Sequence, residues 1–299
     1  MTTRRRFLCS LGAAVLLAGC GLCLPSFCEE PRILLVGDSW AQGIWVAHVM
    51  EAAFREAGMG DVGVAGDATA LGGTRAEQWV QKEYRAKIAG ELAKHLSIDT
   101  VHLIIGGNDV LKRIKETNVF EAWNETRRQR EWQSIAGNVR RIVEYCLSFS
   151  QVRHVVIGGY DYLNAGTARE ALGTLGQRFD FGGMTQAQVN RCFIELEGLK
   201  RDLAKEIKGC AYIHNFGLAQ HRYDTPKGAP APGGPPDYIP FPGGNPDYPM
   251  PDQAFTTVAL GSQTFAGDGV HPSEDTHKRM ILHAIEQCYR GWFTEQRLP

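Results

Sequence analysis

The feature that most constrains the fold of this chain is a short, uninterrupted apolar run at residues 33–36, Ile-Leu-Leu-Val. It ends at Gly37 and is followed directly by Asp38 and Ser39. Four apolar residues without polar alternation are typical of a strand that is buried on both faces of a parallel sheet. Ser39 then falls at the carboxyl edge of the sheet, where α/β proteins form ligand crevices. Because a serine hydroxyl is a weak nucleophile at neutral pH, Ser39 would need a base and a site for negative charge from elsewhere in the chain.

A candidate base lies near the other end, in Asp-Gly-Val-His-Pro-Ser at residues 268–273, just before a helical pattern. Asp268 and His271 are three residues apart in a turn, so they can share one face. The carboxylate can then accept a hydrogen bond from the ring, fix its tautomer and leave the other nitrogen to take a proton from Ser39. The alternative is that Asp268 and Ser273 are only turn and helix-cap residues ahead of Pro272.

Two middle segments can supply donors for a developing negative charge. The apolar run 101–105 predicts a second buried strand, and Gly-Gly-Asn-Asp follows it at 106–109. Glycines allow close approach of the backbone, and the Asn108 amide can donate a hydrogen bond. Leu-Gly-Gly-Thr at 71–74 precedes an amphipathic run, where an exposed glycine N–H is a second candidate donor. Taken singly, both segments are ordinary turns.

In combination and in this order, the segments 37–39, 73, 106–109 and 268–272 resemble the four blocks of the SGNH (GDSL-type) hydrolases, a family of serine esterases and lipases. The resemblance covers nearly the whole chain after its first 30 residues. It implies that Ser39 is the nucleophile, His271 the base and Asp268 the group that orients the base. It also implies an oxyanion hole made of the backbone N–H groups of Ser39 and Gly73 and the side chain of Asn108.

The chain departs from the family pattern in two places. Trp40 stands where the family commonly has leucine, a position that concerns packing or the pocket rim. Gly72 and Gly73 compete for the donor role, and Gly73 is preferred because it directly precedes Thr74, where a helix is expected to begin.

A further loop is expected at the same edge of the sheet. The apolar run 152–157 predicts another strand, and Gly-Gly-Tyr-Asp-Tyr follows it at 158–162. This loop either lines the pocket or is a turn with packed tyrosines, Tyr160 and Tyr162. The complete set of candidate pocket residues is Asp38, Trp40, Asp109, Tyr160 and Asp161.

Strand patterns alternate with helical patterns along residues 31–299. The strands are predicted at 33–36, 61–64, 99–105, 152–157 and 211–214, and the last two long helices at 185–208 and from 272 or 273 onward. A polar stretch at 112–130 is expected to lead into a long helix that ends near Phe149. We therefore predict a single domain with a three-layer α/β/α doubly wound, mostly parallel sheet of about five strands, in the flavodoxin-like arrangement that the family resemblance implies.

The first 19 residues are interpreted as an export signal. Three arginines precede an apolar run at 7–19, which is shorter than the roughly 20 residues that a membrane-spanning helix needs. The arginines form a twin-arginine-like pattern. Leu-Ala-Gly-Cys at 17–20 resembles a bacterial lipobox, which predicts a lipid on Cys20, a tether at 20–30 and a periplasmic or cell-surface lipoprotein of the bacterial envelope. The alternative is a plain signal peptide that is cleaved a few residues later.

Residues 217–267 form a predicted insertion, dense in proline and glycine from 225 to 251. Such a segment is extended rather than helical or paired in a sheet. Two interpretations stay open: a disordered excursion, or a loop whose aromatic residues pack against the body and form a wall or lid of the site. Those aromatic residues are Tyr223, Tyr238, Phe241 and Tyr248.

Composition excludes several classes of partner. The full chain has a formal charge of −1, and the chain without residues 1–19 has 29 basic against 33 acidic residues, or −4. This offers no electrostatic case for nucleic acid or for an anionic lipid surface. No cysteine pair or cysteine–histidine cluster after residue 30 has zinc spacing, and we expect no metal or organic cofactor. Cys192 and Cys210 are the preferred pair if a disulfide forms, and free thiols are the alternative.

These observations predict an exported, lipid-anchored serine hydrolase that cleaves carboxylic esters, either carbohydrate O-acetyl or short-chain acyl esters. The substrate would be a small-molecule or polysaccharide ester, and membrane association would come from the lipid anchor alone. The alternatives are a lysophospholipase or thioesterase type of lipid hydrolase, and a non-catalytic binding lipoprotein on the same scaffold.

Overall fold

The computed structural model describes residues 30–60, 62–115, 117–170, 179–224, 226–235, 238, 245–248, 259–260, 263–264 and 268–295. The predicted export signal, Cys20 and much of the 217–267 insertion, including Phe241, lie outside these ranges. Within them, no helix has both the length and the apolar content that a membrane crossing requires.

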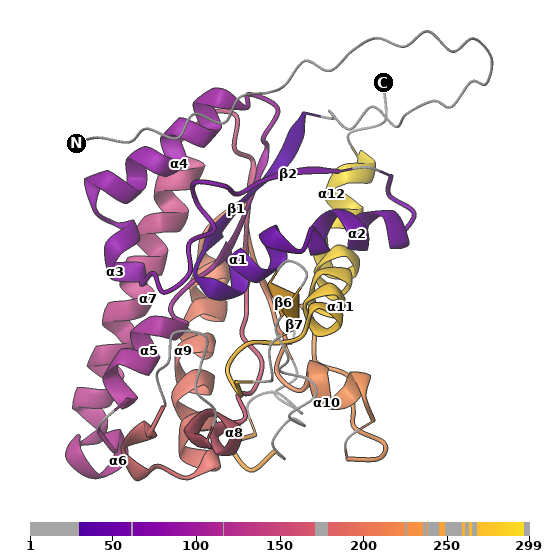
Figure 1. The fold of residues 1–299 in the computed structure, drawn as a ribbon. Coiled ribbons are helices and arrows are strands. Elements are labelled where there is room, and N and C mark those ends of the chain that lie inside the picture. The colour runs from indigo at the N-terminus through magenta and orange to yellow at the C-terminus, as the bar shows by residue number, and fades with distance from the viewer. Residues whose placement is uncertain are drawn as a thin grey trace, which may run out of the picture.

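A parallel sheet of five strands forms the centre of the molecule (Figure 1). Its strands run in the order β2-β1-β3-β4-β5, and each neighbouring pair is parallel. This is the flavodoxin-like order of a doubly wound sheet. The predicted fold class is confirmed, and the strand bounds differ from the predicted ones by a few residues. These bounds are β1 (Pro31–Gly37), β2 (Gly63–Ala65), β3 (Thr100–Ile104), β4 (His154–Gly158) and β5 (Cys210–Ile213).

Helices cover both faces of the sheet, so the strands are buried from two sides (Figure 1). One layer packs around the start and the end of the chain: α1 (Ser39–Val46), α2 (Val49–Glu56), α11 (Glu274–Ala284), the π-helical turn η3 (Ile285–Tyr289) and α12 (Arg290–Glu295). The other layer contains α3 (Ala76–Trp79), α4 (Lys82–Lys94), α7 (Glu125–Leu147) and α9 (Gln186–Glu206). Shorter elements are α5 (Gly107–Ile114), α6 (Val119–Ala122), α8 (Ala165–Glu170), η1 (Phe181–Gly183), α10 (Leu218–Arg222) and the pair β6 (Ala259–Leu260) and β7 (Gln263–Thr264).

Local sequence explains where the long helices begin. Thr185 caps α9 in a reciprocal capping box with Gln188, and the Ser273 side chain accepts a hydrogen bond from the backbone N–H of Thr276 at the start of α11. The polar stretch 112–130 is largely helical rather than a separate connection, because it contains the end of α5, all of α6 and the start of α7. Asn124 caps α7 by accepting from Arg127 N, so the charged residues after it form a solvated helix face.

The described residues answer two questions that the sequence left open: whether Cys192 and Cys210 form a disulfide, and whether the 217–267 insertion packs against the body. Cys192 and Cys210 are not joined, and both are free thiols. The described parts of the insertion pack against the body, since the hydroxyl of Tyr238 donates to Tyr212 O at 2.6 Å and that of Tyr162 donates to Asn245 O at 3.0 Å. These contacts lie beside β5 and the loop that follows β4.

Candidate active site

The nucleophile candidate sits in a sharp turn between β1 and α1. Gly37 has a φ of +148°, and a Cβ at this position would lie only 1.9 Å from Ile104 O on the neighbouring strand β3. Glycine is therefore required for the close approach of the two strands. The turn is held by Asp38, whose backbone N–H donates to Ile104 O at 3.0 Å and whose side chain accepts from Trp40 N at 3.1 Å. Ser39 follows as the first residue of α1, and it is partly exposed.

The structure brings His271 and Asp268 to Ser39 across 232 residues of sequence. His271 Nε2 lies 2.7 Å from Ser39 Oγ, and His271 Nδ1 lies 2.6 Å from Asp268 Oδ2. The other carboxylate oxygen of Asp268 accepts from the backbone N–H groups of Val270 and His271, each at 2.9 Å. A proton on Nδ1 satisfies the carboxylate and leaves Nε2 to accept from the serine hydroxyl, which is the tautomer a general base needs.

Electrostatics keep Asp268 ionised. Burial alone would raise the pKa of this carboxyl group, but its hydrogen bonds to the ring and backbone of His271 and to Val270 N–H, together with the nearby His271 charge, outweigh burial. The pKa of Asp268 therefore lies below its usual range. An ionised Asp268 can hold the imidazole in place and stabilise the imidazolium that forms when the base takes a proton.

The two candidate oxyanion turns, at residues 71–74 and 106–109, are joined to each other beside Ser39. Asn108 Nδ2 donates to Thr74 O at 3.1 Å, and the amide has a second N–H to offer a ligand. The Thr74 hydroxyl lies 2.8 Å from Leu71 O and 3.2 Å from Gly37 O, which anchors the 71–74 turn to the nucleophile turn. Gly73 has a φ of +75° in this turn, and a Cβ on Gly72 would lie 3.8 Å from Ser39 Cβ. Both glycines thus belong to the turn next to the nucleophile.

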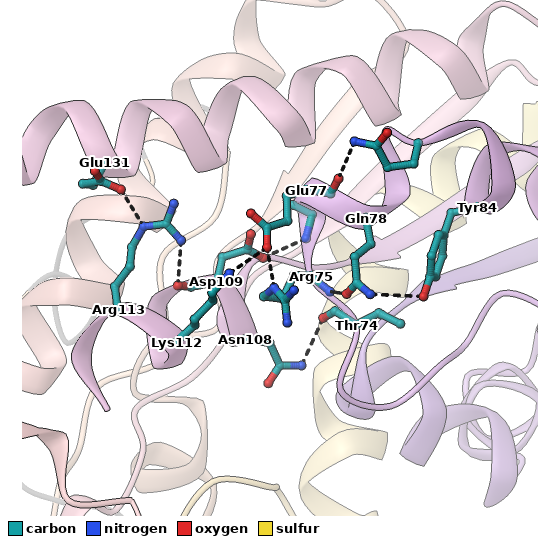
Figure 2. A network of polar contacts seen from close by, with 12 residues as sticks. Thr74, Arg75, Glu77, Gln78, Tyr84, Asn108, Asp109, Lys112, Arg113 and Glu131 are labelled. Atoms are coloured by element: carbon teal, nitrogen blue, oxygen red, sulfur yellow. Dashed lines mark hydrogen bonds and ion pairs between the residues drawn. The ribbon is translucent and has the colours of Figure 1, made fainter. Parts of the chain in front are cut away.

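Asp109 lies behind the oxyanion turns and not in the pocket. Its Oδ2 accepts from Ala76 N at 2.7 Å at the start of α3, and burial raises its pKa. Figure 2 shows its side chain pointing away from that of Asn108. In the same network Glu77 contacts Arg75 Nε at 2.7 Å and Lys112 Nζ at 3.0 Å. The network thus connects the 73–76 turn with α5.

A small cavity opens beside Ser39. The space open to the centre of a water molecule is about 10 Å³, so the cavity accommodates one group of about the size of water or methyl. Its walls come from the turn at 37–39 that carries Ser39 (the nucleophile turn) and the turn at 268–271 that carries His271 (the base turn). The start of α5, the loop after β4 and α9 complete the walls. The lining residues are Asp38, Ser39, Trp40, Gly107, Asn108, Leu111, Tyr160, Leu163, Phe193 and Val270.

Three of the five predicted pocket residues, Asp38, Trp40 and Tyr160, line this cavity. Asp161 does not, because its buried carboxyl group accepts from Tyr162 N and Gly217 N, both at 2.7 Å, and from Ala219 N at 2.8 Å. Burial raises the pKa of Asp161 to about 7, even though the three N–H donors act in the opposite direction. Asp161 thus connects the loop after β4 to α10.

Sequence reasoning did not name five of the lining residues as part of the site: Gly107, Leu111, Leu163, Phe193 and Val270. Leu111 could have been found, since it lies one helical turn after Asn108. Phe193 reaches the cavity from α9, and no local pattern indicates this.

Trp40 connects the nucleophile helix with the base turn. Its indole N–H donates to Val270 O at 3.1 Å, one residue before His271. Its ring meets Tyr160 and His277 edge to face, at centroid distances of 4.9 and 5.7 Å. Burial lowers the pKa of His277 to about 3, so this ring is neutral in the packing around Trp40. In the described part of the chain, no group of three or more His, Cys, Asp or Glu side chains could hold a metal ion.

No protein-family model matches the chain, and no curated protein matches its sequence. Solved structures do match. An acetyl xylan esterase from Geobacillus stearothermophilus is 13% identical, with 87% of this chain and 94% of that chain covered and a TM-score of 0.48. A carbohydrate acetylesterase from Sinorhizobium meliloti is 14% identical, with 88% and 100% covered and a TM-score of 0.46. The strand order and layers of this chain are themselves those that the resemblance to SGNH hydrolases implies.

Proposed function

We propose that this protein hydrolyses carboxylic esters through a Ser39-His271-Asp268 triad. The observation that carries the proposal is the continuous chain of two short hydrogen-bonding contacts, 2.7 Å from Ser39 Oγ to His271 Nε2 and 2.6 Å from His271 Nδ1 to Asp268 Oδ2. A serine that only capped a helix would not need an imidazole and a carboxylate in line behind its hydroxyl group. The four-block resemblance to SGNH hydrolases supports the same assignment.

The reaction follows from the geometry. Ser39 Oγ attacks the acyl carbonyl carbon while its proton moves to His271 Nε2, and the carbonyl oxygen becomes an oxyanion. When the bond to the alcohol breaks, His271 returns the proton to the leaving oxygen, and an acyl-enzyme remains on Ser39. Water then attacks this ester and loses a proton to His271. His271 returns that proton to Ser39 Oγ as the bond from Oγ to the acyl carbon breaks, which releases the carboxylic acid and free Ser39.

The oxyanion would be bound by donors from two turns. These are the backbone N–H groups of Ser39 and Gly73 and the second amide N–H of Asn108. Each donor of this kind is worth about 3–4 kcal/mol of the activation barrier when it is held in place beforehand. The bond from Asn108 to Thr74 O fixes the amide before substrate arrives.

The cavity beside Ser39 supports a short acyl group. The cavity has room for one methyl-sized group, which fits an acetyl ester, whereas a fatty acyl chain entering it would need to displace buried side chains such as Phe193 and Leu163. This favours an acetylesterase over a lysophospholipase or a long-chain thioesterase. With the predicted export, we propose O-acetyl groups on carbohydrate as the substrate class.

The proposed location rests on residues 1–20 and is separate from the chemistry. An export signal followed by a lipid on Cys20 would place the enzyme in the bacterial envelope. Metabolic labelling with a radioactive fatty acid tests this, because label in the wild-type protein that is absent from Cys20→Ala would support the anchor. Equal labelling of both would refute it.

The test of the mechanism is labelling of the purified protein with a fluorophosphonate, which reacts only with an activated serine. We expect labelling at Ser39 that is lost in Ser39→Ala and in His271→Ala, with all three proteins folded by circular dichroism. A folded wild-type protein that takes no label would overturn the proposal and favour a binding protein on the same scaffold. Activity of the wild type on acetyl, butyryl and octanoyl esters then decides the acyl group.

A further inference from the structure

Tyr160, in the loop after β4, lies where the nucleophile turn meets the oxyanion turn at 106–109. Its hydroxyl donates to Asp38 Oδ2, on the residue before Ser39. The same hydroxyl oxygen accepts from Gly107 N at 3.0 Å, on the residue before Asn108. One phenol oxygen therefore links the two segments that carry the nucleophile and the side-chain oxyanion donor.

The ring of Tyr160 is fixed by packing on several sides. A Cβ on Gly107 would lie only 2.7 Å from Tyr160 Cζ, so glycine is required there for the ring to reach its place. Trp40 and Phe193 meet the ring edge to face, at 4.9 and 6.1 Å between centroids. The Lys200 ammonium lies 4.7 Å from the centroid of the ring, and Tyr160 is only 2% exposed. A side chain held in this way keeps the two segments it joins at a fixed separation.

The hydroxyl is used entirely within the protein. It has one hydrogen to donate, which goes to Asp38, and it accepts the Gly107 N–H. Although Tyr160 lines the cavity, its polar atom is directed at the two turns. Substrate therefore meets mainly the ring.

Charges around Asp38 show why the carboxylate needs this partner. Burial raises the pKa of Asp38 to about 6, and the hydrogen bonds from Tyr160 and Trp40 N–H together with the positive charges of His271 and Lys200 act in the opposite direction. Lys200 is itself paired with Glu197 at 2.6 Å, and both are buried. A carboxyl group with a pKa near neutrality changes its hydrogen bonding when a partner is lost.

We propose that Tyr160 is a positioning residue for the triad reaction: its hydroxyl locks the Asp38–Ser39 turn to the Gly107–Asn108 turn, so that nucleophile and oxyanion donor keep one fixed geometry. This inference rests on the proposed ester hydrolysis at Ser39. It assigns Tyr160 no contact with the reacting atoms. The hydrogen bonds of Tyr160 to Asp38 and Gly107 are present before substrate binds. Their loss would raise the free energy of the transition state most, because both turns then act on one carbonyl group.

The test compares Tyr160→Phe with Tyr212→Phe. Both wild-type tyrosines are buried, and both donate to a buried carboxylate, because the Tyr212 hydroxyl donates to Glu197 Oε2 at 2.8 Å. Tyr212 lies on β5 and its hydroxyl group bonds to Glu197 on α9, so Tyr212→Phe controls for the loss of a buried hydroxyl group. We expect Tyr160→Phe to lower kcat on an acetyl ester about 10–100-fold with KM changed less than threefold. Tyr212→Phe should keep kcat within about twofold at a similar cost in stability.

The pH dependence of kcat adds a second readout, because a general loosening of the fold would not shift the pH at which kcat declines. Removing the Tyr160 hydroxyl takes a donor from ionised Asp38 and so raises the pKa of that carboxyl group further. The decline of kcat on the acid side should therefore begin at higher pH in Tyr160→Phe than in the wild type and in Tyr212→Phe. His271, Lys200 and Tyr160 are the charged or titratable groups that face Asp38, and only Tyr160 is changed.

A double-mutant cycle completes the test and covers a variant that fails to fold. Asp38→Asn should lose kcat to a similar extent, and Tyr160→Phe combined with Asp38→Asn should lose little more than either alone, because the two act through one hydrogen bond. If Tyr160→Phe does not fold, Asp38→Asn is compared with Glu91→Gln, which changes a buried carboxylate on α4 whose ion-pair partner is His95, and equal kcat values overturn the proposal.

The two possible failures are distinguishable. If the wild type has no activity beyond that of Ser39→Ala, the proposed function itself is wrong. If the wild type is active and Tyr160→Phe keeps its kcat and its acid limb, or loses no more than Tyr212→Phe, only the role of Tyr160 is refuted.

Discussion

The two halves of the candidate site are built in different ways. The half that carries the proposed base is local: Asp268 and His271 lie in one turn, and the carboxylate of Asp268 also holds the backbone of that turn. The half that carries the nucleophile is assembled from distant segments. Gly37 and Asp38 are bonded to the 69–74 segment, to β3 and to Tyr160 after β4. A local turn is specified by a few adjacent residues, whereas an assembled one depends on the whole sheet.

Among the described residues, the turn at 268–271 is attached to the rest of the molecule at a few points. Asn164 N donates to Gly269 O at 2.8 Å, Trp40 Nε1 donates to Val270 O at 3.1 Å, and α11 begins shortly afterwards with the Ser273 cap. The nucleophile turn continues directly from a strand buried on both faces. We therefore expect substitutions in the base turn to change chemistry with modest loss of stability, and substitutions behind the nucleophile turn to change both.

The largest effect should come from the base. His271→Ala removes the acceptor of the serine proton but leaves the sheet and the nucleophile turn intact, because His271 is in a surface turn with its side chain 17% exposed. We expect kcat on an acetyl ester to fall about 10⁴- to 10⁶-fold while the melting temperature changes little. A large drop in melting temperature would show that the base turn also supports the fold, which would contradict the comparison.

Asp268→Asn should rank next. An amide can accept the two backbone N–H groups through its oxygen, but its NH₂ group then faces His271 Nδ1 and favours the tautomer with the proton on Nε2. That tautomer cannot take a proton from Ser39, and the expected loss in kcat is about 10⁴-fold with KM nearly unchanged. Because the folded state lowers the pKa of Asp268, the wild-type carboxylate contributes stability above its unfolded pKa and loses it as the pH falls through the folded value. Asp268→Asn should remove this acid-side loss, which urea unfolding at pH 3 and pH 7 would measure.

The difference between the halves also determines how much could be predicted from sequence. The Asp-x-x-His spacing shows that Asp268 and His271 can meet, and the buried strand ahead of Ser39 places the serine at the edge of the sheet. Pairing the two required a family resemblance, since 232 residues of sequence separate them. Tyr160 was predicted as a pocket residue, but its hydrogen bonds to Asp38 and Gly107 depend on how β1, β3 and β4 lie in register. No sequence periodicity indicates that Lys200 and Phe193 on α9 extend to Tyr160 and to the cavity.

On the nucleophile side, Asn108→Ala should have the largest effect among residues that leave the triad intact. The variant removes one proposed oxyanion donor and its bond to Thr74 O. We expect kcat to fall about 10²- to 10³-fold with KM within about threefold, because the donor binds a charge that exists only in the transition state. Asn118→Ala is the control, since it removes a helix cap on α6, away from the cavity. A rise in KM with unchanged kcat would assign Asn108 to substrate binding instead.

Trp40→Phe tests the contact between the two halves. The ring is mostly kept, but the donor to Val270 O is lost, so the base turn is less firmly held against α1. We expect about a tenfold loss of kcat. Trp45→Phe, on the same helix and packed against His48, should leave kcat unchanged. Equal effects of the two substitutions would mean that the halves are held together without the indole.

The smallest effect on acetyl esters, and the most informative about specificity, is expected from Phe193→Leu. Phe193 is 3% exposed and belongs to α9, so it shapes the cavity without belonging to either half of the site. A smaller side chain there adds room for roughly one or two methylene groups, each worth about 0.8 kcal/mol when buried. Activity on acetyl esters should fall less than about threefold, while kcat/KM on butyryl esters should rise about tenfold. Leu203→Ala, a buried α9 change two to three turns further along and outside the cavity, controls for loosening of the helix. If Phe193→Leu leaves the ratio of butyryl to acetyl activity unchanged, the acyl group does not enter this cavity, and the acetyl preference argued from its volume is wrong.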